Sequence, residues 1–279
     1  MYFCSEGGAL VMEYAVNIEM LYPGIPFCNR IGRVKQAGFD AIEFWGWHDK
    51  DIDDILGTCK KNGVRVQAIS ATGNYSPGDR QHQAECIRWV ERTIKVAEKL
   101  GTKYIIMFPN HFTKEGCSNF CDKYTKSDGI AAITALLMRL EPKLESSGIT
   151  LLLEPLNNHG ADNGMLVTDT EEGAAIIRAV NSDYVRLLLD VFHMQLMHGN
   201  LWEHIRENLD IAPYIHLADV PDRHEAGTGE INFRYLLHML REKGYEGTIC
   251  PEYLPQEDTD DSLYIWKQLL VGNDKRDSS

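Results

Sequence analysis

Short apolar runs alternate with amphipathic stretches along almost the whole chain. Eight of these runs are short, bounded by polar residues and rich in Val, Ile and Leu, which predicts strands at 15–20, 40–46, 64–70, 103–110, 150–156, 185–193, 214–220 and 247–254. Apolar residues at helical spacing follow each run, often closed by a glycine suited to a helix C-terminus, which predicts helices at 27–38, 51–63, 80–100, 128–147, 168–180, 196–208, 232–244 and 258–271.

The regular order of strand and helix predicts one α/β domain. Short connections between strand and helix place consecutive strands parallel, and eight such units favour a closed barrel over an open sheet. A length of 279 residues suits one barrel, and no linker rich in Pro, Ser or Gly divides the chain. We therefore expect a single (β/α)8 TIM barrel over residues 15–272. An N-terminal extension over 1–14 and a frayed tail over 273–279 flank it, and translation could start at Met1 or at Met12.

Composition excludes several functional classes. The formal net charge is −13, which repels phosphate backbones, so nucleic acid is not an expected partner. The seven cysteines are scattered and odd in number, which favours a reducing cytoplasm over a disulfide framework. The first residues lack the basic region of a signal peptide, and no apolar stretch reaches membrane-spanning length, so no membrane partner is expected.

Polar residues end four consecutive predicted strands. Three leucines lead into Glu154, "RLLLD" ends at Asp190, "YIH" carries His216 and "TICPE" ends at Glu252. The C-terminal ends of barrel strands lie on one rim, so these side chains should converge there. Three converging carboxylates repel one another, and a divalent cation relieves that repulsion. Three oxygens and one nitrogen suit Mn²⁺, Mg²⁺, Co²⁺ or Zn²⁺.

Each of these residues also has an ordinary explanation. A carboxylate after a strand is often a helix cap or a solvated loop residue, and a single histidine is often structural. Four such residues on adjacent strands are harder to explain separately, so the set as a whole predicts a metal site.

Longer motifs around these residues resemble a known family. "AGFDAIEFWGW", "LLLEPLN", "LLLDVFHMQ", "HLADVPDRHEAGTGEINF" and "GYEGTICPEYLP" are similar to motifs of the hydroxypyruvate isomerase branch of the xylose isomerase-like superfamily of sugar phosphate isomerases and epimerases. The resemblance spans roughly residues 15 to 256 and implies a metal-dependent TIM barrel. Hydroxypyruvate isomerases typically have glutamine where this chain has His216, whereas ketose 3-epimerases have histidine there.

The resemblance implies roles for particular residues. Glu154 and Glu252 match glutamates that are both metal ligands and acid/base groups, with Mn²⁺ or Mg²⁺ the expected ion. His193 and Arg223 match substrate-binding positions. The residues leave other roles open: His193 could cap a helix or lie buried, and Arg223 could pair within its own loop with Asp222 or Glu225.

Trp45 and Trp47 follow the second predicted strand, where they could stack on a sugar at the barrel mouth. They could equally belong to a lid or to a contact in a homo-oligomer.

Elementary chemistry supports the implied mechanism. A proton beside a carbonyl is too weakly acidic for a carboxylate alone, and a metal that binds the carbonyl and the adjacent hydroxyl stabilises the enediolate. One carboxylate then removes a proton and another returns one. Return to the adjacent carbon gives isomerisation, and return to the opposite face of the same carbon gives epimerisation.

Four hypotheses follow for the activity. The first is an isomerase of carbohydrate metabolism that interconverts hydroxypyruvate and tartronate semialdehyde or a related small substrate. The second is a ketose 3-epimerase of the D-tagatose or D-allulose type, suggested by His216. The third is a metal-dependent apurinic endonuclease, which the net charge opposes. The fourth is a sugar-binding barrel without catalysis, which the presence of both Glu154 and Glu252 disfavours.

Overall fold

The computed structural model describes residues 12–113, 116–117, 124–160 and 164–271. The strands are β1 (Glu13–Tyr14), β2 (Val16–Asn17), β3 (Ala41–Phe44), β4 (Arg65–Ser70), β5 (Tyr104–Met107), β6 (Phe112–Thr113), β7 (Gly116–Cys117), β8 (Thr150–Leu153), β9 (Val185–Asp190), β10 (Tyr214–Leu217) and β11 (Thr248–Pro251).

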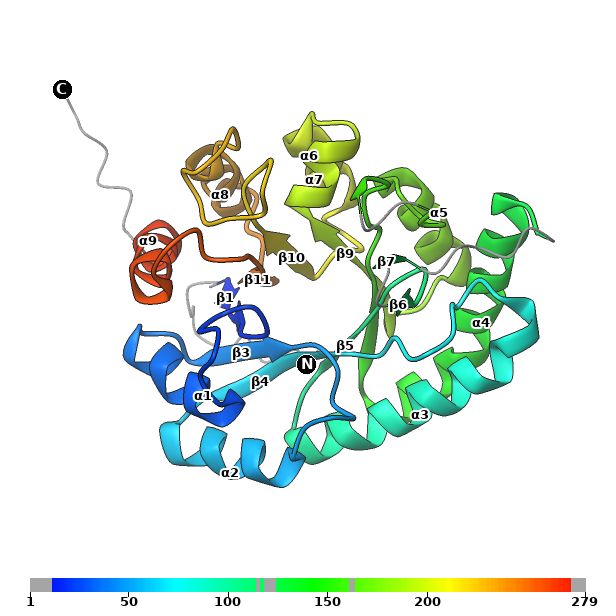
Figure 1. Ribbon diagram of the computed structural model, residues 1–279. Helices are drawn as coiled ribbons and strands as arrows, with labels where there is room; N and C mark the ends of the chain where they lie inside the picture. The colour runs from blue at the N-terminus through cyan, green and yellow to red at the C-terminus, as the bar shows by residue number, and fades with distance from the viewer. Residues whose placement is uncertain (1–11, 114–115, 118–123, 161–163, 272–279) are drawn as a thin grey trace, which may run out of the picture.

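The helices surround the strands (Figure 1). They are α1 (Phe27–Gln36), α2 (Ile52–Asn62), the 3₁₀ turn η1 (Arg80–His82), α3 (Gln83–Leu100), α4 (Lys126–Ser147), α5 (Thr170–Val180), α6 (Val191–Met197), α7 (Leu201–Asn208), α8 (Phe233–Glu242) and α9 (Thr259–Val271).

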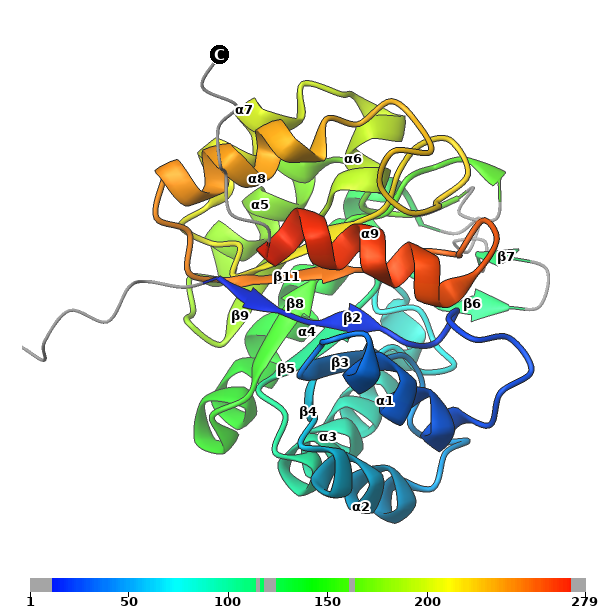
Figure 2. The ribbon, with the colours of Figure 1, turned by 90° about the vertical axis from the view of Figure 1, so that its left-hand side faces the viewer.

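The main sheet is parallel and closes on itself. Its strand order is β1-β11-β10-β9-β8-β5-β4-β3-β2. β1 pairs with β11, and β2 pairs with β3. One stretch of chain therefore makes both pairings, with only Ala15 between its two halves. Figure 2 shows this stretch lying between β11 and β3. β1 and β2 together therefore take the place of one strand in an eight-stranded barrel. The predicted (β/α)8 fold is confirmed.

Alternation along the strands separates an inner core from an outer one. Small, branched aliphatic and aromatic residues fill the barrel interior as one buried cluster: Ala15, Ala41, Ala68, Tyr104, Ile106, Leu152, Leu188, Tyr214 and Cys250. Their strand neighbours, such as Leu151 and Leu153, belong to the larger cluster that packs against the helices. Since successive side chains point to opposite faces, a residue two positions beyond an interior residue also points inward.

Strand and helix boundaries differ from the prediction around Asp190. The sequence predicts a strand over 185–193 and one helix over 196–208, but β9 ends at Asp190 and α6 begins at Val191. The Asp190 side chain accepts hydrogen bonds from the backbone N–H groups of Phe192 and His193, which starts a helix directly after the strand. Gly199 and Asn200 have positive φ and separate α6 from α7.

The ends of the chain test the predicted domain limits only in part. The sheet begins at Glu13, two residues before the predicted start of the domain. The rest of the predicted N-terminal extension and the tail over 273–279 lie outside the described residues.

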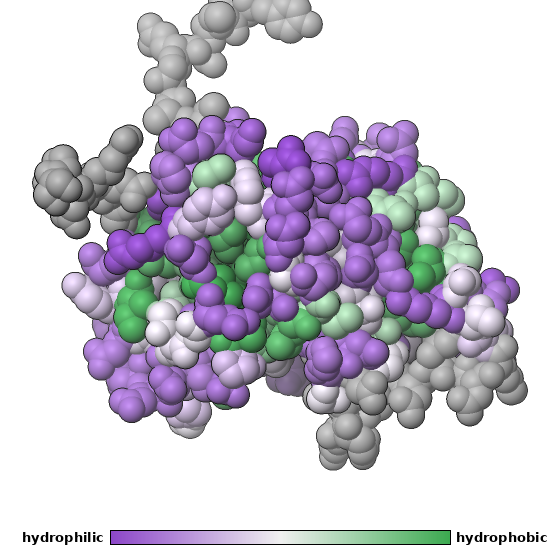
Figure 3. Space-filling model, turned by 90° about the horizontal axis from the view of Figure 1, so that it is seen from above, coloured by the Kyte–Doolittle hydropathy of each residue, from purple (hydrophilic) through white to green (hydrophobic). Residues whose placement is uncertain are grey.

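The outer surface is mainly hydrophilic in the view of Figure 3, with apolar residues in patches between polar ones. Among the described helices, none combines the length and the apolar character that crossing a membrane requires.

Candidate active site

Strand alternation brings a set of polar side chains into the barrel. Glu154 lies two positions after the interior residue Leu152, Asp190 two after Leu188, His216 two after Tyr214 and Glu252 two after Cys250. The same spacing places Asn17 two after Ala15 and Glu43 two after Ala41. All six polar side chains are buried.

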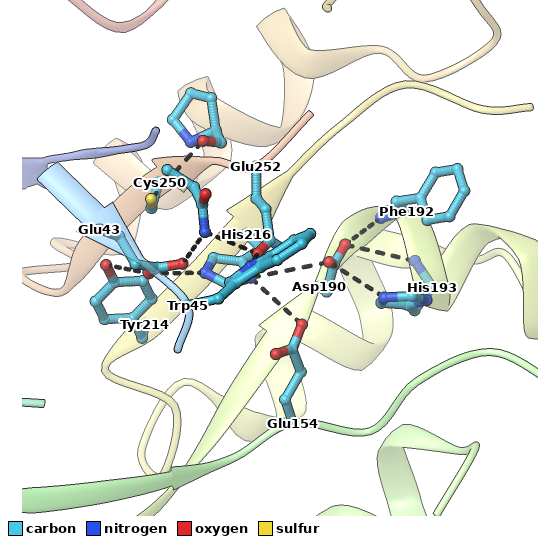
Figure 4. Close-up of polar contacts among 12 residues, drawn as sticks. Glu43, Trp45, Glu154, Asp190, Phe192, His193, Tyr214, His216, Cys250 and Glu252 are labelled. Carbon is cyan, nitrogen blue, oxygen red and sulfur yellow. Dashed lines mark hydrogen bonds and ion pairs between the residues drawn. The ribbon is translucent and has the colours of Figure 1, made fainter. Parts of the chain in front are cut away.

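Four of these residues converge as the sequence predicts. Glu154, Asp190, His216 and Glu252 each offer one atom to a group in which all the atoms lie within 4.8 Å of one another. His216 Nδ1 lies 3.3 Å from Glu154 Oε1, 3.2 Å from Glu252 Oε2 and 3.9 Å from Asp190 Oδ2. The three carboxylates point toward His216 (Figure 4). Asp190 and His216 lie in β9 and β10, and Glu154 and Glu252 are the residues that directly follow β8 and β11.

The donor set fits a divalent cation. Burial, together with the neighbouring carboxylates Glu252 and Asp190, raises the pKa of Glu154 to about 8, although His216 opposes the shift. Glu154 Oε2 is one of the few buried side-chain atoms in the described chain without a hydrogen-bond partner. An unpartnered buried oxygen is costly, and a cation beside three carboxylates and an imidazole would satisfy it.

Cationic side chains partly balance the other two carboxylates. Burial opposes ionisation of Asp190, but Arg223, His193 and His216 outweigh it and lower the pKa of this carboxyl. Burial likewise opposes ionisation of Glu252, but His216 and Arg223 lower its pKa well below the ordinary range. Burial alone would lower the pKa of His216, yet Glu43, Glu252 and Glu154 together raise it well above the ordinary value.

Arg223 reaches the same group from the loop after β10. Its Nη2 atom lies 2.7 Å from Asp190 Oδ2 and 2.5 Å from Glu252 Oε2. Among the described residues these are its ion pairs, rather than pairs with Asp222 or Glu225 in its own loop. Its backbone φ is 60°, a conformation that non-glycine residues rarely adopt and that often occurs at functional sites.

His193 lies in the first turn of α6, three residues after β9 ends at Asp190. The Asn157 backbone N–H donates to His193 Nδ1 at 3.1 Å. The other ring nitrogen, Nε2, lies 3.1 Å from Arg223 Nη1 and 3.5 Å from Asp190 Oδ2. Burial lowers the pKa of His193 to about 4, which keeps the ring neutral near pH 7.

The two tryptophans after β3 differ in position. Trp45 Nε1 donates to Glu252 Oε1 at 2.6 Å, so Trp45 lies beside the group and lines the cavity described below. Trp47 is buried, donates to Thr93 Oγ1 at 2.9 Å and packs against Trp89 with ring centroids 5.2 Å apart. Trp47 therefore does not line the cavity and is not placed to stack on a sugar there, because the chain leaves β3 at Phe44 and the turn that follows packs Trp47 against α3.

A cavity of about 540 Å³ opens onto the group. Glu154, His193, Arg223 and Glu252 line its polar end, and most of the remaining wall is aromatic, polar but uncharged, or apolar: Met20, Trp45, Gly46, His48, Ser70, Thr72, Gly73, Asn74, Trp89, Phe108, Phe112, Leu156 and Phe192. Within that lining Arg223 is the fixed cation. A cavity of this size accommodates a small polar molecule with room to spare.

The sequence prediction leaves out several residues that shape the site. Asn17, Glu43 and Tyr214 are not among the candidate residues that it names. Asn17 Nδ2 donates to Glu43 Oε1 at 2.7 Å and to Glu252 Oε1 at 2.9 Å. Tyr214 OH donates to Glu43 Oε2 at 2.7 Å. The two-residue spacing from Ala15 and from Ala41 is the signal that could have identified Asn17 and Glu43.

Asp219 is another residue that the sequence prediction omits. It lies buried just after β10 and accepts hydrogen bonds from the backbone N–H groups of four loop residues: Val220, Gly227, Gly229 and Ile231. A Cβ atom at Gly229 would lie 1.8 Å from Val220 O, so glycine is required there. Asp219 thus holds the loop that presents Arg223.

A family model described as the xylose isomerase-like TIM barrel matches residues 31–269. The chain belongs to that family. The resemblance read from the motifs is confirmed, and so is the fold that it implies.

Curated relatives match over nearly their full length. The hydroxypyruvate isomerase of Escherichia coli (strain K12) is 28% identical over 260 residues, which cover 91% of this chain and 97% of the relative. A 2-oxo-tetronate isomerase of Haemophilus influenzae is 27% identical, covering 88% of this chain and 95% of that relative. The expectation of an isomerase is confirmed at this level.

Solved structures share the architecture. An AP endonuclease of family 2 from Brucella melitensis superposes with a TM-score of 0.84 at 25% identity, covering 92% of this chain and 98% of that one. A D-psicose 3-epimerase crystallised with D-fructose superposes with a TM-score of 0.75 at 20% identity, covering 94% and 93%. The latter likeness concerns the fold alone.

Proposed function

We propose that this family member is a divalent-metal-dependent isomerase of the hydroxypyruvate isomerase type, acting on a small hydroxy-keto acid. The observation that carries the proposal is the buried group of Glu154, Asp190, His216 and Glu252 at the inner end of the cavity. The full-length similarity to hydroxypyruvate and 2-oxo-tetronate isomerases supports the substrate class.

Glu154, Asp190, His216 and Glu252 would hold the ion, with Mn²⁺ or Mg²⁺ favoured by the oxygen-rich donor set and Co²⁺ or Zn²⁺ compatible with it. When bound, the ion would supply positive charge for the carbonyl and hydroxyl oxygens of the substrate.

Proton transfer falls to the two glutamates that line the cavity. One of Glu154 and Glu252 removes a proton from the hydroxyl-bearing carbon, and the electron pair left behind forms the carbon–carbon double bond of an enediolate. A proton then adds to the former carbonyl carbon, and the hydroxyl proton moves to the other oxygen. Carbonyl and alcohol exchange places, so no external oxidant or reductant is needed.

The remaining polar residues orient the substrate. Arg223 is the fixed cation of the cavity lining and suits the carboxylate of a keto acid. The neutral ring of His193 suits a substrate hydroxyl or carbonyl oxygen. Trp45 offers an apolar face beside Glu252 and would exclude water from the reacting carbons.

A substrate panel tests the proposal. The protein would be stripped of metal with a chelator and then supplied with Mn²⁺. It would be incubated in D₂O with hydroxypyruvate, 2-oxo-tetronate, fructose, tagatose or allulose, and deuterium bound to substrate carbon would be measured. We expect turnover of a keto acid, and a loss of about 10²–10⁴-fold in Glu154→Gln and in Glu252→Gln. Glu141→Gln is the matched control, because Glu141 lies on α4 and accepts a hydrogen bond from Ser182. Absence of exchange with every substrate would refute the proposal.

A ketose 3-epimerase is the second candidate. The imidazole of His216, where the family's hydroxypyruvate isomerases typically have glutamine, favours it. The cavity of about 540 Å³ also leaves room for a six-carbon ketose. Exchange at C3 of fructose or tagatose, with hydroxypyruvate unchanged, would favour the epimerase over the isomerase.

An apurinic endonuclease is the least supported alternative. In the described part of the chain, the groups that could hold a metal are the four-residue group and the set Glu43, His216 and Cys250, and the two share His216. Independent ligand sets for further zinc ions are not found there. The net charge of −13 also opposes a DNA backbone.

A cytoplasmic location and a homo-oligomeric state stay predictions from the sequence.

A further inference from the structure

Behind His216, on the side away from the metal-binding group, lies a second buried carboxylate. Glu43 is fully buried, and its Oε2 atom lies 3.1 Å from His216 Nε2. Figure 4 shows Glu43 and Tyr214 on one side of His216 and Asp190 on the other. His216 therefore bridges Glu43 and the proposed metal ligands through its two different ring nitrogens.

The other contacts of Glu43 leave it only the role of an acceptor. Asn17 Nδ2 donates to Oε1 at 2.7 Å, and Tyr214 OH donates to Oε2 at 2.7 Å. The remaining hydrogens of Asn17 are accounted for as well, because the same Nδ2 atom donates to Glu252 Oε1 and Asn17 Oδ1 accepts from the Glu19 backbone N–H. An ionised carboxylate with these partners can contact His216 Nε2 favourably only if that nitrogen carries a hydrogen.

We propose that Glu43 is a positioning residue that holds the hydrogen of His216 on Nε2, so that the lone pair of Nδ1 faces Glu154, Asp190 and Glu252. A histidine ligand binds a metal through its unprotonated nitrogen, and the partner of the other nitrogen sets both tautomer and ring orientation. This inference rests on the proposed metal site. In addition, we infer that Asn17 and Tyr214 hold Glu43 in place and so affect His216 only through Glu43.

A competing use of the same residues is a second metal site. Glu43, His216 and Cys250 also offer atoms within 4.8 Å of one another. Both oxygens of Glu43 already accept hydrogen bonds, Oε1 from Asn17 and Oε2 from Tyr214. Glu43 Oε2 also lies 3.1 Å from His216 Nε2, and one imidazole cannot hold its hydrogen on Nε2 while binding a metal there. The positioning role is thus the one that the geometry favours.

Calorimetric titration with Mn²⁺ tests the inference without relying on turnover. The full chain would be stripped with chelator and titrated at constant pH. We expect Glu43→Gln to weaken Mn²⁺ binding by about 10–100-fold, the usual effect of losing such a partner. The amide must turn an N–H group either toward Asn17 or toward Tyr214 and His216, which are donors. Mn²⁺ affinity within twofold of wild type in Glu43→Gln would overturn the inference, whereas no binding by wild type would refute the proposed metal site instead.

Tyrosine variants separate positioning from a general loss of stability. Tyr214→Phe removes one donor to Glu43 and should weaken Mn²⁺ binding several-fold, less than Glu43→Gln. Tyr245→Phe is the matched control, because Tyr245 is also buried but its hydroxyl donates to the backbone carbonyl of Ala212. It should leave Mn²⁺ affinity unchanged. Equal losses in both tyrosine variants would contradict the inference, and thermal unfolding of each metal-free protein checks that it is folded.

A spectroscopic measurement reads the tautomer directly. In protein labelled with ¹⁵N-histidine and loaded with diamagnetic Mg²⁺, long-range ¹H–¹⁵N correlations distinguish a protonated Nε2 from a protonated Nδ1. The His216 signals are identified by their absence in His216→Gln. We expect a protonated Nε2 in wild type and a changed pattern in Glu43→Gln. A Mg²⁺-loaded wild type whose His216 hydrogen sits on Nδ1 would overturn the inference.

Discussion

At the scale of single residues, the site gathers ionisable side chains in the buried interior, where charge is most costly. Glu154 keeps an unpartnered buried oxygen, and its pKa is raised to about 8. The pKa of His216 is raised as well, by the carboxylates on both sides of it. Without a bound cation, the folded protein therefore holds protons that the unfolded chain would release at neutral pH.

This proton uptake predicts the direction in which the stability of the metal-free protein changes with pH. A group whose pKa is higher in the folded state loses its stabilising proton as pH rises, so stability falls toward higher pH. Loss of protons from Glu154 and His216 should therefore lower the stability of the folded protein as pH rises from about 6.5 to 8. His193, with its pKa lowered to about 4, acts in the opposite sense, but only below about pH 6.5. The melting temperature in chelator should fall from pH 6.5 to 8.

Calorimetry of the chelated protein across this pH range measures the effect. In Glu154→Gln the slope should become shallower, because one of the two proton-holding groups is gone. A melting temperature in chelator that rises over the same interval would show that other groups dominate the linkage.

At the scale of elements, one carboxylate organises the loop that follows β10. Asp219 accepts four backbone hydrogen bonds from that loop, and Arg223 leaves the loop in a left-handed backbone conformation to reach Asp190 and Glu252. The loop is thus built around a side chain that does not itself line the cavity. Its effect on catalysis must pass through the position of the guanidinium.

We expect Asp219→Asn to lower kcat/KM for the keto acid by about 10–100-fold, since small displacements of an orienting group cost that much. Mn²⁺ affinity should stay within about threefold, because Asp219 contacts none of the four proposed ligands. Steady-state kinetics and calorimetry on the same preparation measure both quantities. Asp222→Asn, an exposed carboxylate in the same loop, is the control. Loss of metal affinity equal to the loss of kcat/KM would place Asp219 in the metal site instead.

Element boundaries also show where sequence reasoning succeeds and where it fails. Alternating strands and helices predict the barrel, and polar residues at the ends of β8, β9 and β11, together with His216 in β10, predict all four converging side chains, because strand ends are marked by local composition. The boundary at Asp190 was misplaced, because Val191 and Phe192 suit a strand as well as a helix and only the cap distinguishes them. Asn17 was missed because its partners lie 26 and 235 residues away.

At the scale of the whole molecule, the proposed metal site joins four neighbouring strands of the barrel. Its residues come from the ends of β8, β9, β10 and β11. The barrel itself closes where β1 pairs with β11. An ion held there would link four strands that otherwise meet through backbone hydrogen bonds and the buried interior cluster. Because the unfolded chain cannot assemble this donor set, binding should raise the stability of the entire domain.

Saturating Mn²⁺ should therefore raise the melting temperature of the chelated protein. At a free concentration 100 times the dissociation constant, linkage gives about 2.7 kcal/mol. For a domain of this size that corresponds to roughly 5 °C. Asp190→Asn should lose most of this gain, because a neutral amide replaces one of three anionic ligands, whereas Glu141→Gln should keep it. Differential scanning calorimetry with and without the ion measures the shift. Tight calorimetric binding without any rise in melting temperature would mean that Mn²⁺ binds the unfolded chain as well, and the four-strand site would not be its only ligand.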